Sequence, residues 1–241
     1  MTTWIIERNI NEACESVAQT AILAGHRVVR WDTGDTIPHP EGQCIFLGSL
    51  TMCPTMPGVV GDPRNLEVTA WIGALEHLVL NKKRLFLTVS QIGPSAVPNN
   101  WDPVFVRPDS CMKPFAGRVL PRDNLSPAAL DFGFYYDDPK LVVVLSPAQQ
   151  VLDEWRFVAH NRQIIAYSGY SAATRSTTTS NPPSLAFEVA EEAARLSPEP
   201  TVVIDVCQVP KGTYHLVEYN LFSGSDLYGC NPHDIVKAIS R

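Results

Sequence analysis

The texture of the chain changes part-way along its 241 residues. Before residue 90, short apolar runs alternate with segments of helical spacing, such as residues 11–24, which Gly25 follows. After residue 103, most apolar runs have the length of strands, and few helical segments separate them. Alternating strands and helices predict a mainly parallel sheet. Consecutive strands instead predict antiparallel sheets.

We therefore expect an α/β domain over residues 1–90, followed by an α+β domain with antiparallel sheets over residues 91–241. Residues 91–103, rich in Pro, Asn and Gly, have the composition of a linker. The polar segment 171–180 is expected to be a mobile loop. The expected helices cover residues 11–24, 68–80, 185–196 and 233–239, with Leu185, Val189, Ala193 and Leu196 as the buried stripe of the third. The expected strands cover residues 3–7, 27–31, 44–48, 84–89, 103–107, 117–120, 141–145, 155–159, 163–167, 202–207 and 214–219.

Composition excludes several classes of protein. A hydrophobic fraction of 45% with 18% charged residues is typical of a globular chain. The net charge of −6 argues against a broad nucleic-acid-binding face, although a local basic groove stays open. No apolar run reaches the roughly 20 residues of a membrane span, and the first residues lack the pattern of a signal peptide. We expect a cytoplasmic protein whose six scattered cysteines are free thiols.

Three oxygen-bearing residues near the C-terminus form the most informative cluster. Asp205 ends an apolar strand, and Glu218 and Asn220 lie two residues apart on the next one, so the latter pair share a face. If the two strands form a hairpin, Asp205 approaches that pair. Carboxylate and amide oxygens suit magnesium, which also takes phosphate oxygens from a nucleotide. Solvated polar positions on an edge hairpin would give the same pattern.

Two cations lie six residues apart in the middle of the chain. Arg107 ends a strand, and Lys113 lies in a loop that returns to a strand after Gly117. Arginine offers phosphate a fixed fork and lysine offers a mobile charge. Surface cations in a turn are the alternative interpretation.

A third cluster alternates along one strand. Glu154 and Arg156 share one face, while Trp155 and Phe157 share the other. This is good geometry for a polar site above an apolar back face. An ordinary half-buried strand with an ion pair fits the pattern equally well.

The order of these clusters resembles the ATP-grasp superfamily, from about residue 103 to the C-terminus. Residues 154–158, 161–165 and Tyr170 look like that family's central strand pair. Residues 203–206 and 216–220 look like its metal-binding end. The closest look-alikes are short bacterial and phage members of the superfamily. The first ninety residues would be its smaller α/β domain.

This resemblance implies a magnesium- and ATP-dependent ligase and gives individual residues roles. Asp205, Glu218 and Asn220 would hold magnesium against the β- and γ-phosphates. The remaining implied roles are phosphate contacts for Lys113 and Arg107, an adenine-binding hinge at Val144, Leu145 and Ser146, ribose or site support for Glu154, an acyl-phosphate or substrate contact for Arg156, and a second substrate-anion clamp for Arg175. Arg107 departs from the pattern, because many family members have lysine there.

The implied reaction joins a small-molecule or peptide carboxylate to an amine or similar nucleophile through an acyl phosphate. Phosphoryl transfer asks little of a protein beyond positioning and cationic clamps, which these clusters supply. An ATP-dependent kinase and a non-catalytic nucleotide-binding module remain alternatives. Competing motifs are missing from the sequence: it has no Walker A loop, no GxGxxG, no HExxH and no GxSxG.

Overall fold

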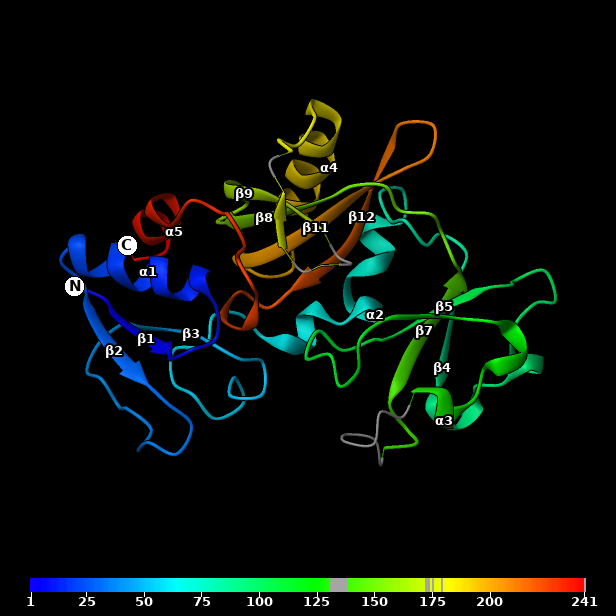
Figure 1. Ribbon diagram of the computed structural model, residues 1–241, viewed down its shortest axis with the longest axis horizontal. Helices are drawn as coiled ribbons and strands as arrows, with labels where there is room; N and C mark the ends of the chain where they lie inside the picture. The colour runs from blue at the N-terminus through cyan, green and yellow to red at the C-terminus, as the bar shows by residue number, and fades with distance from the viewer. Residues whose placement is uncertain (131–137, 172–173, 175, 179, 241) are drawn as a thin grey trace.

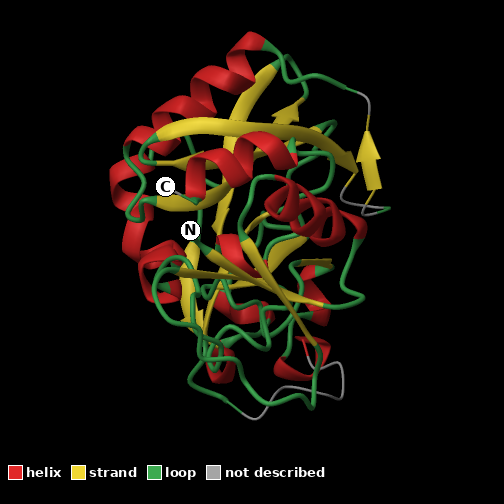
Figure 2. Cartoon of the chain, turned by 90° about the vertical axis from the view of Figure 1, so that its left-hand side faces the viewer, coloured by secondary structure: helices red, strands yellow, loops and turns green. Residues whose placement is uncertain are grey.

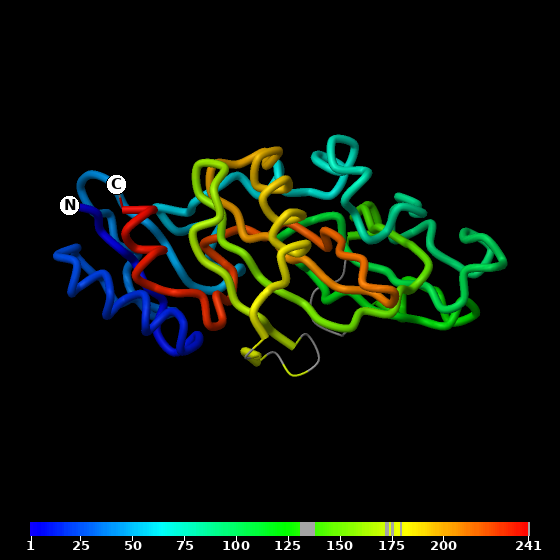
Figure 3. Tube along the Cα trace, turned by 90° about the horizontal axis from the view of Figure 1, so that it is seen from above, coloured from blue at the N-terminus to red at the C-terminus, as the bar shows by residue number. Residues whose placement is uncertain are grey.

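Three sheets follow one another along an elongated molecule (Figures 1 and 3). The computed structural model describes residues 1–130, 138–171, 174, 176–178 and 180–240. Both termini lie at the same end, because the C-terminal helix α5 (Pro232–Ile239) packs against the N-terminal helix α1 (Glu12–Leu23). The last part of the chain therefore packs against the first.

The N-terminal unit is a small parallel sheet. Its strands β1 (Thr3–Glu7), β2 (Arg27–Trp31) and β3 (Cys44–Leu47) run in the order β2-β1-β3. Asn11 starts α1 by accepting a hydrogen bond from the backbone N–H of Cys14 at 2.9 Å, and the chain leaves the helix through Gly25 at φ +80°. The predicted α/β start is confirmed.

A second, antiparallel sheet has the order β4-β7-β5-β6. Its strands are β4 (Leu85–Thr88), β5 (Val104–Pro108), β6 (Arg118–Leu120) and β7 (Val142–Pro147). Because β4 pairs with β7, it belongs to this sheet and not to the N-terminal one, so the structural boundary lies before β4 rather than at residue 90. The expected linker 91–103 is packed, since Ile92, Val97 and Trp101 are buried in the core of this sheet.

The third sheet has the order β10-β9-β8-β11-β12 and is antiparallel throughout. Its strands are β8 (Glu154–His160), β9 (Gln163–Ser171), β10 (Ser176–Thr178), β11 (Thr201–Val209) and β12 (Thr213–Asn220). Helix α4 (Ser184–Arg195) covers one face and α5 the other, as Figure 2 shows. The segment expected to be a mobile loop thus contains β10.

Short helical turns fill the connections. They are η1 (Pro63–Leu66), α2 (Val68–Trp71), η2 (Ile72–Leu75), η3 (Val89–Gln91), η4 (Pro94–Ala96), η5 (Arg122–Asn124), α3 (Pro127–Leu130) and η6 (Phe222–Gly224). The predicted helix 68–80 is wrong beyond Leu75, because the backbone there pairs with β12 instead: Leu216 donates to Leu78 and accepts from Leu80, both at 2.9 Å. Among the helices described, none is long and apolar enough to cross a membrane.

The buried stripe of α4 is offset by one residue from the prediction. Alanines 186, 190, 193 and 194 are fully buried against the sheet, while the side chain of Leu185 is 50% exposed. Small side chains let the helix axis approach the strands closely, so volume decides which face turns inward and the larger Leu185 lies outside.

Enlarging the helix face tests this packing. We expect Ala190→Leu to lower the free energy of unfolding by about 1–3 kcal/mol, because the close-packed interface has no room for three more carbons. Leu185→Ala at the exposed position should change it by less than about 0.5 kcal/mol. Urea unfolding of both variants measures the difference, and equal effects would contradict the assigned face.

Candidate active site

The sheet register brings polar residues of three strands into one row. Arg156 on β8 pairs with Asp205 on β11, which pairs in turn with Glu218 on β12. Asn220 lies two residues further along β12 and therefore on the same face. The hairpin predicted from the turn at residues 210–212 forms, with Lys211 and Gly212 in the left-handed region at φ +76° and +71°. Asp205, Glu218 and Asn220 are thus brought together, as expected.

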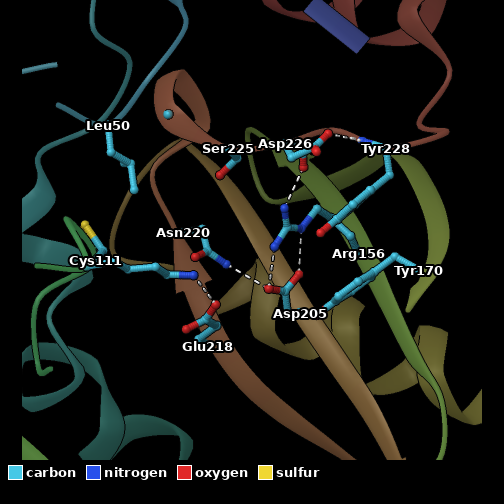
Figure 4. Close-up of a pocket in the computed structure, with 12 residues that line it drawn as sticks. Leu50, Cys111, Arg156, Tyr170, Asp205, Glu218, Asn220, Ser225, Asp226 and Tyr228 are labelled. Atoms are coloured by element: carbon cyan, nitrogen blue, oxygen red, sulfur yellow. Dashed lines mark hydrogen bonds and ion pairs between the residues drawn. The ribbon is translucent and has the colours of Figure 1, made fainter. Parts of the chain in front are cut away.

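Asp205 is held from two sides (Figure 4). The guanidinium of Arg156 donates from Nε to Oδ1 at 2.8 Å and from Nη2 to Oδ2 at 2.7 Å, and the amide of Asn220 donates to Oδ2 at 2.9 Å. Both charged side chains are almost fully buried. A paired fork of this kind is the strongest side-chain hydrogen-bond geometry that proteins use.

Arg156 is occupied by the protein itself. Besides its two bonds to Asp205, Nη1 donates to the backbone carbonyl of Asp226 at 2.5 Å. Its guanidinium carbon also lies 5.3 and 5.0 Å from the ring centroids of Tyr170 and Tyr228, which stack at 4.8 Å and 7°. The contact with an acyl phosphate or substrate carboxylate that the sequence analysis assigned to Arg156 is therefore not the contact seen here. The side chain orients Asp205.

A second ionic group joins two sheets. Glu218 of the third sheet binds Lys113 Nζ through Oε1 at 2.6 Å and Arg107 Nη2 through Oε2 at 2.8 Å, and both cations belong to the second sheet or its β5–β6 loop. Burial alone would raise the pKa of Glu218, but the charges of Lys113 and Arg107 outweigh it and hold that pKa below its usual value. The two predicted clusters therefore meet.

Two cavities adjoin at this ion pair. One, of about 320 Å³, is lined by the Asp205 side of the site and extends to Leu50 of the N-terminal unit. The other, of about 240 Å³, lies between the second and third sheets and has apolar walls from Phe105, Phe115 and Val217. Lys113, Tyr170 and Glu218 line both. We call the two cavities together the cleft.

Glu154 lies in the smaller cavity. Burial, followed by the charge of Asp205, raises the pKa of its carboxyl to about 7. The hydroxyl of Tyr170 donates to its Oε1 at 3.2 Å, which favours the charged form but does not offset burial. The carboxyl can thus change its protonation state near neutral pH.

The expected adenine hinge is not a hinge. Val144, Leu145 and Ser146 are inside β7, paired with β5, and the connection to the third sheet is made by residues 148–153. Val144 and Leu145 are buried in cores on opposite faces of the sheet, and none of the three residues lines the cleft. Ser146 is on the Phe105 face and, within the described residues, its buried Oγ has no hydrogen-bond partner. Arg175 lies outside the described residues.

Sequence reasoning missed the residues that close the cleft. Tyr228 and the backbone of Asp226 come from the loop after Asn220, and Phe105 and Phe115 come from β5 and the loop after it. An aromatic residue in a loop gives no periodic signal, so nothing in the local pattern marked Tyr228. Alternation along β5 could have found Phe105, because it lies two residues before Arg107 and shares its face.

The donor set fits a hard cation with a polyphosphate. Asp205 and Glu218 supply carboxylate oxygens, and Asn220 donates its N–H to Asp205, which leaves its carbonyl oxygen directed elsewhere. Within the described residues no group of three or more His, Cys, Asp or Glu side chains forms a complete metal cage. Magnesium is usually held by one or two carboxylates with substrate phosphates completing its shell, so two carboxylates and an amide suffice.

This fold and site define an ATP-grasp protein. Residues 84–238 match a family model described as an ATP-grasp domain, family 2 of its clade, and the chain belongs to that family. No curated protein matches the chain. The resemblance to the superfamily and the predicted fold class are confirmed.

Solved structures share the fold at low identity. D-cycloserine synthetase DcsG is 12% identical, with 99% of this chain and 98% of that chain covered and a TM-score of 0.68. The RimK domain protein ATP-grasp from Sphaerobacter thermophilus DSM 20745 is 12% identical over 100% of both chains, with a TM-score of 0.66. The ATP-grasp ligase PsnB, complexed with minimal precursor, Mg and ADP, is 14% identical over 98% and 96%, with a TM-score of 0.57.

Removing the fork that holds Asp205 should destabilise the fold. We expect Arg156→Gln to lower the free energy of unfolding by about 3–5 kcal/mol, because Asp205 is left as a buried, uncompensated charge. Arg156→Lys should recover part of this loss, since it restores charge without the fork. Arg64→Gln removes an exposed ion pair with Asp62 and should cost less than about 1 kcal/mol in the same urea titration. Similar losses at both positions would contradict the assignment.

Glu154 should make stability depend on pH. Its pKa in the folded state, about 7, lies above the usual 4.5, so the folded state binds this proton more tightly and loses stability as pH rises from about 4.5 to 7. We expect Glu154→Gln to match the wild type near pH 5 and to exceed it by on the order of 2 kcal/mol near pH 8. Urea unfolding between these pH values measures the difference. A difference that does not grow with pH would rule out the raised pKa.

Proposed function

We propose that the chain is an ATP- and magnesium-dependent ligase that activates a carboxylate as an acyl phosphate and transfers it to an amine or similar nucleophile. The observation that carries this proposal is the meeting of Lys113 and Arg107 with Glu218, Asp205 and Asn220 at one cleft between two sheets. Family membership supports ATP-dependent ligation in general. The donor set supports magnesium.

The cleft suggests how a nucleotide is placed. The aromatic and aliphatic walls of the smaller cavity, Phe105, Phe115 and Val217, suit the adenine ring, and Glu154 in the same cavity can accept hydrogen bonds from ribose hydroxyls. The phosphates then pass Lys113 and Glu218 into the larger cavity towards Asp205. Lys113 lines both cavities and so can follow the phosphate chain.

Charge favours an anionic ligand. Arg107, Lys113 and Arg156 contribute three positive charges against the two of Asp205 and Glu218, which leaves the site one positive charge in excess. Lys113 and Arg107 can exchange Glu218 for phosphate oxygens, and the freed carboxylate joins Asp205 and the Asn220 carbonyl as metal ligands. Magnesium, when bound, would neutralise charge on the β- and γ-phosphates.

The acid substrate would enter from the other end of the larger cavity, where Leu50, Gly224 and Ser225 meet. A carboxylate oxygen attacks the γ-phosphorus and ADP leaves. The amine then attacks the acyl carbon and phosphate leaves. Here the residues position reactants and stabilise charge, and Arg156 acts through Asp205. Among the structures of similar fold, PsnB is recorded with precursor peptide, which supports peptides beside small molecules as candidate acids.

A change of one atom at Glu218 tests the site. We expect Glu218→Gln to abolish the magnesium-dependent part of the thermal stabilisation by ATP and to lower acid- and amine-dependent ADP release by about 10²-fold or more. Wild type at a hundred times the dissociation constant should gain about 2.7 kcal/mol. Glu188→Gln, exposed on α4, is the matched control and should behave as the wild type.

The products separate the proposal from its competitors. Formation of ADP, phosphate and an amide supports the ligase, whereas ADP with a phosphoester would identify a kinase. Nucleotide binding that Glu218→Gln leaves unchanged, without turnover on any acid and amine pair, would favour a non-catalytic nucleotide-binding module. If no nucleotide shifts the melting temperature of the wild type, the proposed site is refuted.

A further inference from the structure

The outer edge of β9 is unpaired over five residues. β9 covers Gln163–Ser171, but β10 pairs with it only at positions 169–171. Among the described residues, no backbone hydrogen bond joins the outer side of residues 163–167 to another segment. Such an edge presents N–H and C=O groups at strand spacing, which is a template for one more strand.

A groove follows each side of this edge. On the α4 side, a cavity of about 480 Å³ lies between β9 and the helix residues Phe187, Glu191 and Arg195, which are four apart and share one stripe. On the α5 side, a cavity of about 540 Å³ is lined by hydroxyl and amide side chains that include Ser168, Thr177 and Asn231. Ile165 and Tyr167 line both cavities. Two grooves flanking one edge match the alternation of side chains along a strand.

The two grooves differ in chemistry. The α4-side groove has an aromatic floor, where Tyr167 packs edge-on against Phe187 at 5.0 Å and is still 42% exposed. At its far end lie Arg162 and Arg195, whose guanidinium groups outnumber the single carboxylate of Glu191. The exposed Arg195 side chain is 63% accessible. This groove therefore suits a large apolar side chain followed by an acidic one, while the other suits small polar side chains.

From this geometry we infer that the outer edge of β9, residues 163–167, binds an extended peptide as an added strand of the third sheet, with apolar and acidic side chains in the α4-side groove and small polar ones in the α5-side groove. Main-chain hydrogen bonds would supply affinity and the grooves specificity. The inference goes beyond the proposed ligase, because it requires neither nucleotide nor turnover.

The peptide site adjoins the cleft. Gly229 lines the α5-side cavity and donates from its N–H to Ser168 Oγ at 3.1 Å, while its neighbour Tyr228 lines the cleft. Ser168 also pairs with Arg156 across β8 and β9. A peptide on this edge would therefore be held beside the active-site loop, which is a suitable place to anchor a peptide whose other end reacts.

A library of capped hexapeptides tests the inference directly. The probes are acetylated, amidated sequences of the pattern Thr-X-Thr-X-Thr-Asp, where X is Leu, Ile, Val, Phe or Tyr. We expect saturable binding by the best members in fluorescence anisotropy, and slower hydrogen exchange of the outward amides of residues 163–167 when they bind. N-methylation of alternate peptide amides should abolish binding in one phase and spare it in the other, because only one set faces β9.

Two variants and one control localise the binding. Tyr167→Ala and Arg195→Glu should each weaken it by about tenfold or more, since they remove an aromatic contact and reverse a charge. Lys140→Glu, an equally drastic change on an exposed loop of the second sheet, should leave it unchanged. All three variants should keep the ATP-dependent thermal shift, so failure here is distinguishable from failure of the nucleotide site.

Several results would overturn the inference. They are the absence of saturable binding by any member of the library, equal binding by both N-methylated series, or binding that Tyr167→Ala and Arg195→Glu leave intact. A concentration-dependent dimer in sedimentation that Arg195→Glu disrupts, together with no peptide binding, would instead assign the edge to a second copy of the chain.

Discussion

The contact of Glu218 with Lys113 and Arg107 is the interaction on which the arrangement of the cleft depends. It links β12 of the third sheet to β5 and its loop in the second, across the space where the two cavities meet. A carboxylate this deeply buried is tolerated because two cations compensate for its lost hydration. The same charges that hold the sheets together in this structure are those that a polyphosphate would require.

The two carboxylates of the site differ in how firmly they are committed. Asp205 is gripped by the planar fork of Arg156, whose side chain is 8% exposed, whereas Glu218 binds Lys113, whose side chain is 34% exposed. Lysine is a flexible point charge with three donors, so it can turn from a carboxylate to a phosphate at little cost. The rigid pair thus fixes the geometry, and the exchangeable pair leaves room for a ligand.

Sequence predicted the parts of this structure that depend on local pattern. Asn11 and Gly25 marked the ends of a helix, and the two-residue spacing of Glu218 and Asn220 placed them on one face. It failed where tertiary packing decided. The stripe of α4 turned by one residue because alanines fit against the sheet, and residues 144–146 continued as a strand because β5 was available for pairing.

Arg156 shows why spacing cannot assign chemical roles. Sharing a strand face with Glu154 correctly placed it in the site, but spacing could not show that β11 would bring Asp205 beside it, nor that the loop after Asn220 would supply the Asp226 carbonyl and the Tyr228 ring. Each of these partners is at least 49 residues away along the chain. A guanidinium surrounded in this way by its own protein orients an acidic ligand more effectively than it recruits a substrate, since its donors are already engaged.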